Sequence, residues 1–379
     1  VRFRFFAVVM LILSGGCSLA PSFERPDVPM AEEFNLEGLE VSSATPKITR
    51  LGWSRFFGAP RLNELIAIAI ENNRDLRKAI QRVEEARALY GIQRADQLPS
   101  ISAGAMASRS RVPADLSITG RPLTSSQYQA TLFLSTWELD FWGRVRNLKE
   151  AALESYLASE EAWRAVQISL VAEVANVYLL ERELDERISI ARRTLTTREA
   201  SGRIMRLRYE VGAGSKLDAI QAEILLNQAR SELAELERQR EQSRNALTLL
   251  VGIPLAPETR PLSQIETTFL KEIAPGLPSE LLLNRPDIIA AEHQLKAAHA
   301  NIGAARAAFF PHITLTGDLG SASGDLDGVF GSGSRIWSFV PSLSLPIFDG
   351  GRNRANLDLA EARRNIAVAD YERTIQEAF

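Results

Sequence analysis

Hydrophobic residues in the middle of the chain recur at spacings of three and four, with charged residues between them. The segment from Arg144 to Val211 contains no proline and one glycine, Gly202, and is rich in strong helix formers. One helix over this segment would be about 100 Å long at 1.5 Å per residue. Such a length predicts a coiled-coil stalk or a wall. The apolar positions that follow the helical spacing are Val166, Leu170, Val174, Val177, Leu180, Leu184 and Ile188.

A short turn interrupts this helical pattern at Val211–Ser215. Gly212 and Gly214 can adopt the positive φ that ends a helix, and Ser215 can cap the next one. The sequence therefore predicts a helical hairpin with its tip at this turn. The other predicted helices are Lys216 to about Leu250, Arg61–Leu98 and Pro286–Phe309.

Four other segments alternate between apolar and polar residues with a period of two, which is typical of strands with one polar face. Each is about 10 residues long, a length that suits a tilted membrane strand as well as a half-buried strand of a soluble sandwich. The loops between them, Ser108–Ser126 and Ser321–Ser334, are rich in Ser and Gly. The apolar positions are Ile101, Ala103, Ala105 and Ala107, then Ala130, Leu132 and Leu134, then Ile313, Leu315 and Leu319, then Trp337, Phe339, Leu343 and Leu345.

The same helix–strand–strand–helix unit occurs twice in the sequence. Arg74–Ser102 resembles Pro286–Thr314 at a constant offset of 212 residues, as from Gly91 to Gly303. A Gly-Arg helix start then follows in both copies, at Arg144 and Arg352, with an offset of 208 residues. This duplication determines the expected architecture.

The first residues have the features of an export signal. Arg2 and Arg4 precede a short apolar stretch and then Cys17, the only cysteine. This position indicates the acceptor of a bacterial lipoprotein signal, and an ordinary secreted protein cleaved nearby is the alternative. Residues 18–50 are polar and proline-containing, and they indicate an extended tether or a wrapping arm.

The overall charge narrows the possible partners. The protein has 379 residues with a net charge of −3, so it lacks the basic excess that nucleic acid binding requires. No apolar run reaches the ~18–20 residues of a membrane-spanning helix.

If the four strands enter a membrane, they cannot do so alone. An open sheet in lipid leaves its edge groups unpaired, and four strands are fewer than the roughly eight of the smallest membrane barrels. Several chains would therefore share one barrel. Aromatic residues near the strand ends fit an interfacial girdle, although core packing would explain some of them: Tyr128, Trp137, Phe141, Trp142, Trp337 and Phe348.

Several motifs together resemble the TolC-like outer-membrane efflux proteins, in particular the NodT-like lipoprotein branch. They include WELDFWGRVRN, RYEVGAGSKLDAIQAE, NRPDIIAAEHQLKAAHANIGAARAAFFPHITLTG and LSLPIFDGGRNRANLDLAEA, and the resemblance covers most of residues 50–375. It implies a mainly α-helical fold with membrane β-structure, in which a homotrimer forms a 12-stranded β-barrel above a helical tunnel. The implied role is a passive exit duct for drugs or other small molecules. Its partners would be a periplasmic adaptor and an inner-membrane pump of the RND type.

The export signal, the duplication and the resemblance together predict the domain boundaries. These are a signal peptide (1–16), a lipidated tether (17–60), a first repeat (61–250, strands about 99–110 and 127–141), an equatorial connection (251–283) and a second repeat (284–379, strands about 311–321 and 335–348). Beyond Arg352 only Asn353–Phe379 remains. The second helical hairpin is therefore expected to be incomplete at the C-terminal end: either the chain is a fragment or a truncated gene product, or the second hairpin is lost.

Two groups of site residues follow. The resemblance implies that the hairpin tip docks the adaptor, although Asp218 alone would also suit a helix N-terminus. The second group is structural and marks the strand–helix joints, with glycines allowing a turn and a close backbone approach. The tip residues are Val211, Gly212, Gly214, Ser215, Leu217 and Asp218, and the joint residues are Pro99, Gly143, Arg144, Pro311, Gly351 and Arg352.

No motif indicates an enzyme, a cofactor or a metal. The histidines His293, His299 and His312 have no metal-ligand neighbours in the sequence, and we assign them no chemistry. Two other classes remain as alternatives to the channel. A periplasmic adaptor would carry one hairpin between two halves of a small β-domain, and a structural stalk would not need amphipathic strands. The expected location is the outer membrane, with a lipid anchor at Cys17 and a body that extends into the periplasm.

Overall fold

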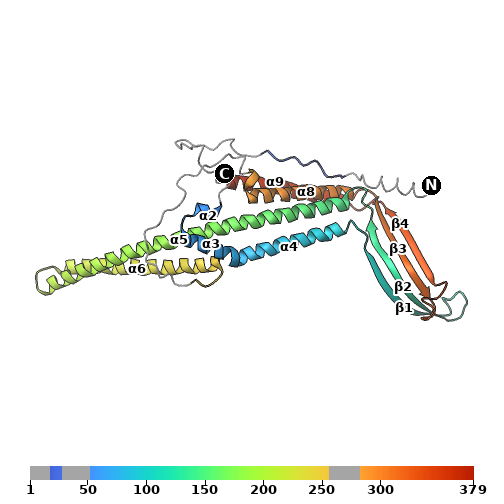
Figure 1. Ribbon diagram of the computed structural model, residues 1–379, viewed down its shortest axis with the longest axis horizontal. Coiled ribbons are helices and arrows are strands. Elements are labelled where there is room, and N and C mark those ends of the chain that lie inside the picture. Colours follow the sequence, from blue (N-terminus) through green and yellow to red (C-terminus); the bar gives the residue numbers. More distant parts are fainter. Residues whose placement is uncertain (1–17, 28–51, 256–281) are drawn as a thin grey trace. The chain divides into compact units, whose positions relative to one another are not determined.

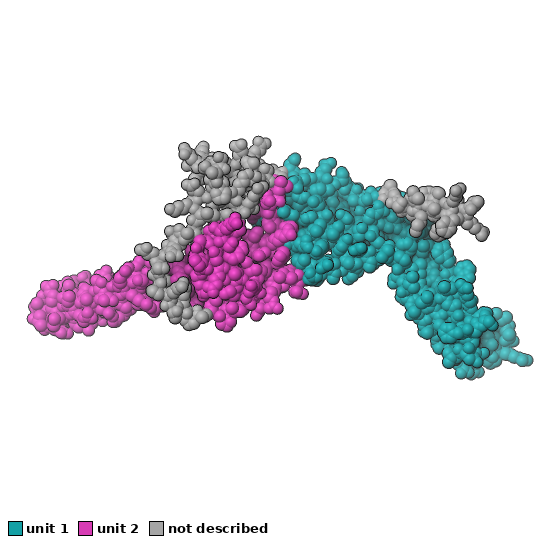
Figure 2. Space-filling model, viewed as in Figure 1, with its two compact units in different colours: residues 1–30, 83–160, 287–379 teal, residues 31–82, 161–286 magenta. Residues whose placement is uncertain are grey.

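The computed structural model describes residues 18–27, 52–255 and 282–379. They form two compact units, shown in different colours in Figure 2. The first unit contains residues 1–30, 83–160 and 287–379, and the second unit contains residues 31–82 and 161–286. Cys17 and most of the predicted connection 251–283 lie outside the described residues.

The described helices agree largely with the helical periodicity of the sequence. The long helix predicted from Arg144 is confirmed as α5, which has 67 residues. The hairpin partner predicted from Lys216 is confirmed as α6. The helices are α2 (Trp53–Phe56), α3 (Pro60–Asn72), α4 (Arg74–Ala95), α5 (Arg144–Glu210), α6 (Lys216–Val251), α8 (Pro286–Ala307) and α9 (Arg352–Ala378).

The prediction of one helix over Arg61–Leu98 was wrong, because the helix breaks at Asn73. This residue is extended, with φ −59° and ψ 131°. Its side chain accepts a hydrogen bond from the Leu76 amide at 2.9 Å and donates one to the Leu250 carbonyl at 2.8 Å. Asn73 therefore caps α4 and ties the break to the end of α6.

The second unit has an apolar core between α3, α5 and α6. Leu62, Leu65, Ile66 and Ala69 follow the i, i+3, i+4, i+7 spacing of a buried helix face, and none is more than 2% exposed. They pack in one cluster with buried residues of α5 and α6, namely Leu170, Val171, Val174, Ala175, Leu247 and Val251.

Four antiparallel strands in the order β1-β2-β3-β4 form one sheet in the first unit, and Figure 1 shows them side by side. The strands are β1 (Ile101–Val112), β2 (Leu123–Glu138), β3 (His312–Ser323) and β4 (Arg335–Ser344). The predicted loops 108–126 and 321–334 were too long. Pairing between β1 and β2 continues to Val112 and Leu123, and β3 continues to Ser323. β2 also begins earlier and ends earlier than the predicted 127–141, with a register shift between Leu134 and Trp137.

The strand register places the apolar positions of all four strands on one face. Paired residues of neighbouring strands point to the same side. Ile101 pairs with Leu134, Leu132 pairs with Leu319, and Leu319 pairs with Trp337. The opposite face carries Ser102, Gln129, Thr131, Thr314, Thr316, Asp318, Ser338 and Ser342, together with the apolar residues Met106, Val112, Leu123, Phe133, Ala322, Ile336 and Val340.

Candidate functional site

The hairpin tip brings all six predicted tip residues into one turn and the start of α6. The α5 helix ends where the amide of Ala213 donates to the Arg208 carbonyl at 2.7 Å, and Gly212 has φ 75°. Ser215 then caps α6, since its hydroxyl accepts a hydrogen bond from the Asp218 amide at 3.1 Å. The glycines and the serine thus make the turn.

The remaining tip residues are directed to solvent. Val211 is 68% exposed and Leu217 is 64% exposed, although neither helix needs an apolar residue there for its turn. Asp218 lines a groove of about 420 Å³ between α5 and α6, on whose other side lie two arginines. The sequence analysis did not predict Arg198 and Arg208. Their spacing of three and four residues with Ser201 and Met205 places all four on one face of α5, which would have indicated them. The groove residues are Arg198, Ser201, Met205, Arg208, Asp218, Gln221, Ala222 and Leu225.

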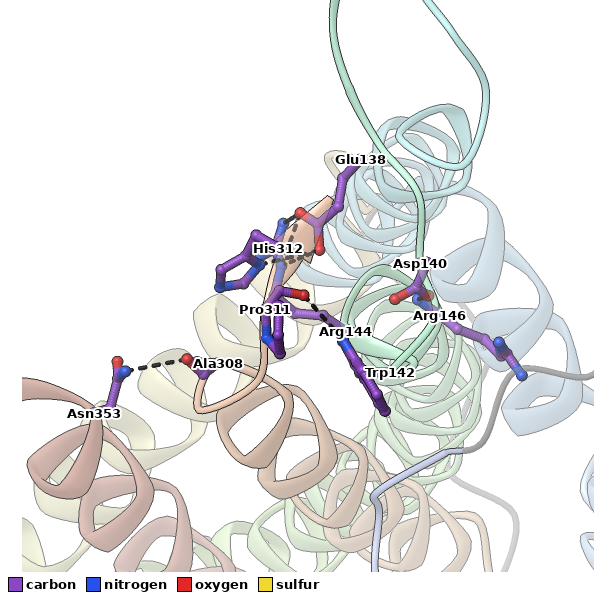
Figure 3. A network of polar contacts seen from close by, with 9 residues as sticks. All are labelled: Glu138, Asp140, Trp142, Arg144, Arg146, Ala308, Pro311, His312 and Asn353. Atoms are coloured by element: carbon purple, nitrogen blue, oxygen red, sulfur yellow. Dashed lines mark hydrogen bonds and ion pairs between the residues drawn. The ribbon is translucent and has the colours of Figure 1, made fainter. Parts of the chain in front are cut away.

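A polar network holds the joint between β2 and α5, as Figure 3 shows. The Arg144 guanidinium donates to both carboxylate oxygens of Glu138, with Nε 2.9 and 3.1 Å away and Nη2 2.5 Å from Oε2. The Nδ1 of His312, the first residue of β3, lies 3.5 Å from the same carboxylate. Arg144 was predicted as a joint residue, whereas Glu138 and His312 were missed.

At the start of α5 and at the start of α9, an aspartate accepts hydrogen bonds from backbone amides. Asp140 Oδ2 accepts from the Arg146 amide at 2.8 Å, and Asp349 accepts from the amides of Gly351 and Asn353, each at 2.9 Å. These hydrogen bonds, led by the one from Asn353, hold the pKa of Asp349 below its usual value. The carboxylates also suit the positive end of the helix dipole.

The joint glycines supply positive φ, with values of 75° at Gly143 and 87° at Gly351. The close backbone approach expected of them does not hold for Gly351, since a Cβ added there would have nothing within 4 Å. Arg352 is exposed at the start of α9.

The prolines lie between helix and strand, as predicted from the sequence. Pro99 stands between α4 and β1, and Pro311 stands directly before β3. The Pro311 carbonyl accepts a hydrogen bond from Trp142 Nε1 at 2.9 Å, and the Trp142 ring stacks on Phe310. Trp142 therefore packs within the joint, whereas Trp337 and Phe348 of the predicted girdle are 73% and 92% exposed.

Residues 18–27 form an extended arm along α8, a feature that the sequence indicated only in outline. Ser18 donates to Asn147 Oδ1 at 2.9 Å, and Ala20 lies so close to Gly303 that a Cβ there would be 2.8 Å from its backbone nitrogen. Farther along α8, Phe23 meets His299 edge-on at 5.4 Å and Arg25 pairs with Glu292 at 2.7 Å. The arm is therefore positioned by contacts with α8 at Glu292, His299 and Gly303.

The histidines have structural partners. His293 Nδ1 lies 2.6 Å from Glu154 Oε2, which joins α8 to α5. Burial, followed by the nearby Arg364 charge, lowers the pKa of His299. Within the described ranges there is no group of three or more His, Cys, Asp or Glu side chains that could hold a metal. Nor does any helix in the described part of the protein have the length and apolar character to cross a membrane.

Comparison with known proteins identifies a family. The sequence matches the family described as "Outer membrane efflux protein" over residues 65–253 and 277–379. It is 48% identical to outer membrane protein OprJ of Pseudomonas aeruginosa over 380 residues, which cover 98% of this chain and 78% of OprJ. It is 45% identical to the toluene efflux pump outer membrane protein TtgI of Pseudomonas putida over 387 residues, covering 100% of this chain and 81% of TtgI.

Solved structures show the same fold. A membrane protein from Pseudomonas aeruginosa superposes with a TM-score of 0.84 at 48% identity, covering 96% of this chain and 81% of that one. The open state of the MtrE outer membrane channel of Neisseria gonorrhoeae superposes with a TM-score of 0.83 at 42% identity, covering 96% of this chain and 80% of that one.

Proposed function

Because the chain belongs to the outer membrane efflux protein family and is the outer-membrane channel of an efflux pump, we propose that three copies close one 12-stranded barrel through which small molecules leave the cell. The channel itself is passive, and an inner-membrane pump of the RND type supplies the energy. The protein meets that pump through a periplasmic adaptor.

The free edges of the sheet support closure by further copies. β1 and β4 are the outer strands of the sheet, so each leaves one row of backbone groups unpaired within the described chain. Each unpaired group costs several kcal/mol in a bilayer. Because β1 and β4 run antiparallel to each other, β4 of one copy can pair with β1 of the next in the pattern that the sheet already uses.

Barrel size supports three copies. Two copies would make eight strands, and an eight-stranded barrel is filled by its own side chains. Three copies make the smallest multiple of four strands that exceeds this size. The apolar face of the sheet then meets lipid and the face with Asp318 and the Ser and Thr residues lines the passage.

The relatives are named for the efflux of toluene, solvents and antibiotics. We infer that this channel likewise passes apolar or amphipathic small molecules. A periplasmic adaptor or a stalk accounts less well for the sequence, since neither needs a two-faced four-stranded sheet.

The tip is the proposed adaptor-docking site. Val211 and Leu217 offer exposed apolar surface, and the groove beside them places Arg208 near Asp218. We expect Leu217→Asp to reduce efflux from intact cells while the trimer mass and the amount in the outer membrane stay unchanged. Unchanged efflux would show that the tip is not the docking site.

We also propose a lipid anchor at Cys17, next to the arm. Ser18 is held at Asn147, in the first turn of α5, directly below the strand joint. A lipid on the preceding residue would then enter the membrane surface that borders the barrel. Radiolabelled palmitate incorporation that disappears in Cys17→Ala tests this anchor.

Two neighbouring residues of β4 can test which face of the sheet meets lipid and which lines the passage. Phe339 lies on the apolar face, opposite Gly317, and Val340 lies on the polar face, opposite Thr316. An arginine facing lipid near the bilayer midplane costs about 2–4 kcal/mol, whereas one in the lumen is tolerated. We expect Phe339→Arg to be lost from the outer membrane, and Val340→Arg to insert and to shift single-channel selectivity towards anions.

Light scattering of the purified wild-type protein in detergent should give a protein mass of three chains. A mass of one chain, or insertion of Phe339→Arg with loss of Val340→Arg, would contradict the proposed function.

A further inference from the structure

The basic residues of the four strands all lie on the apolar face of the sheet. Alternate residues of a strand share a face. Arg109 therefore lies on the same face as Ala107, and Arg335 lies on the same face as Trp337, both of which belong to the apolar face. All three arginines are exposed, and they are Arg109 and Arg111 of β1 and Arg335 of β4.

The acidic residues of the strands lie on the opposite, polar face. In the four strands, which the structure describes throughout, the carboxylates are Glu138 and Asp318, paired with Thr314 and Ser338 of that face. Within the described residues none of the three arginines forms an ion pair, and this includes the loop carboxylates Asp115, Asp325 and Asp327. The sheet therefore separates its charges by face, and the positive charges have no partner on theirs.

The arginines lie at the end of the sheet that is away from the helices. Residues 113–122 join β1 to β2 and residues 324–334 join β3 to β4 at this end, whereas the helices attach to the other end (Figure 1). In the proposed channel the helices extend into the periplasm, so the arginines lie at the outer leaflet. Tyr128 pairs with Ala107 in the apolar-face row next to Arg109, which suits an aromatic residue at the interface. A lipid-facing arginine is costly at the bilayer midplane and tolerated at this depth.

The tilt of the strands determines which residues meet where two copies join. Strands tilted by about 35–45°, about 4.8 Å apart and rising about 3.4 Å per residue, shift by about 1.0–1.4 residues from one strand to the next. Across four strands the shift is about four to six residues. The strand ends give its direction: Ile101 begins β1 and shares a row with Phe339, but β4 continues to Ser344, five residues farther towards the helices (344 − 339).

This shift brings the arginines of different copies together, because β1 and β4 are the edge strands. Within one copy Arg335 shares a row with Ala105. A shift of about four to six residues places it opposite residues 109–111 of the next copy. Side chains opposite or diagonal to each other on one face are within about 4.5–8 Å at Cβ, and like charges at this distance repel. Each junction of two copies therefore gathers three guanidinium groups that need an anion.

We propose that each junction binds the phosphate group of an outer-leaflet glycolipid, between Arg335 of one copy and Arg109 and Arg111 of the next. This inference rests on the proposed closure of the barrel, since no single copy holds the whole site. Arginine suits the ligand because its planar guanidinium donates paired hydrogen bonds to phosphate oxygens. A lipid is the source rather than a free anion, because the apolar rows with Ala107 and Trp337 lie directly beside the arginines, where the acyl chains of the same lipid would run. An assembly of three copies has three such sites.

Native mass spectrometry of the full chain in detergent, titrated with lipid A that carries two phosphate groups, tests the site. The wild-type assembly should bind up to three glycolipids. Arg335→Gln and Arg109→Gln should each raise the dissociation constant about fivefold, and the double variant about 30-fold, as expected for the loss of one charge or two near an anionic lipid. Arg206→Gln removes an exposed charge from α5 in the second unit and should leave binding unchanged.

Two further measurements separate the site from net charge and from folding. Exchanging the side chains of Arg109 and Ser110 (Arg109→Ser with Ser110→Arg) keeps the net charge but moves the guanidinium to the polar face, and should weaken binding as Arg109→Gln does. Without lipid, Arg335→Gln should raise the temperature at which the assembly dissociates on a gel, because it removes repulsion at each junction. Lipid A should raise this temperature more for the wild type than for Arg335→Gln.

The outcomes distinguish the site from the proposed function. A three-chain mass without bound glycolipid, or with equal binding in the wild type and the strand variants, would overturn the site and leave the shared barrel intact. Equal stabilisation by inorganic phosphate or by lipid A without phosphate would also overturn the site. Failure of both single variants to assemble would contradict the repulsion from which the site is inferred. A mass of one chain for the wild type would overturn the proposed function and the site with it.

Discussion

The ion pair between Glu138 and Arg144 makes a quantitative prediction about the strand–helix joint. The substitution Glu138→Gln keeps the side-chain size but removes the charge that faces the guanidinium. Breaking a fully buried pair costs about 3–5 kcal/mol, and breaking an exposed pair costs about 0–1 kcal/mol. The side chains of Arg144 and Glu138 are 34% and 18% exposed, so this pair lies between the two limits. We expect a loss of about 2 kcal/mol, since glutamine can still accept one hydrogen bond.

Hydrogen exchange can measure this loss where it occurs. The amides of Arg146 and Asn147 are held by Asp140 Oδ2 at 2.8 Å and by the Gly143 carbonyl at 2.9 Å. A loss of about 2 kcal/mol lowers their protection about 30-fold if they exchange through opening of the joint.

The control variant is Glu235→Gln in α6. Glu235 also pairs with an arginine, Arg238, but in an exposed pair whose side chains are 54% and 48% accessible. Protection of the neighbouring α6 amides should therefore stay unchanged. A fall in exchange protection of less than about threefold at Arg146 and Asn147 would show that the ion pair does not hold the joint. An equal fall in protection in the control variant would show the same.

Three further predictions concern single positions. Gly303→Ala should release the arm to proteolysis, because the added Cβ meets Ala20, whereas Gly202→Ala, also within a helix, has only an ordinary 3.8 Å contact and should not. Acidification should also release the arm: burial lowers the pKa of His299, so the arm is fully stabilised above the ordinary pKa of 6.5 and loses stability as the pH falls below it. His299→Phe should remove that part of the pH dependence, as measured by proteolysis at each pH. Gly252→Ala should lower the thermal unfolding midpoint more than Gly212→Ala, since both glycines have positive φ but only the Gly252 Cβ meets a backbone oxygen, at 2.5 Å. Equal shifts for these two variants would contradict the steric argument.

The elements that depend on local sequence were predictable. The absence of proline from 144 to 211 gives α5 its length, and Gly212 and Ser215 determine the tip through local backbone geometry. Alternation gave the strand faces, because a period of two admits only two assignments for each strand.

Other features depend on contacts that are distant in sequence and could not be predicted from periodicity. Asn73 breaks a helical pattern because its side chain reaches Leu250, 177 residues away. The positive φ of Gly143 turns the chain so that the start of α5 meets the end of β2. Only in this arrangement can Glu138 bind the Arg144 guanidinium and Asp140 accept from the Arg146 amide. The pattern of α8 shows an alanine face at Gly303 but does not reveal that the arm fills it.

The two repeats together distinguish what one copy buries alone from what it leaves for other copies. Corresponding positions normally have similar surroundings when a duplicated unit is complete within one chain. Here Ala151 and Leu359 occupy the same place in their repeats, yet one is 6% exposed and the other is 47% exposed. The more exposed position carries the larger apolar side chain, which is the reverse of what a solvated surface favours. This reversal and the free edges of β1 and β4 both agree with the proposed closure of one barrel by several copies.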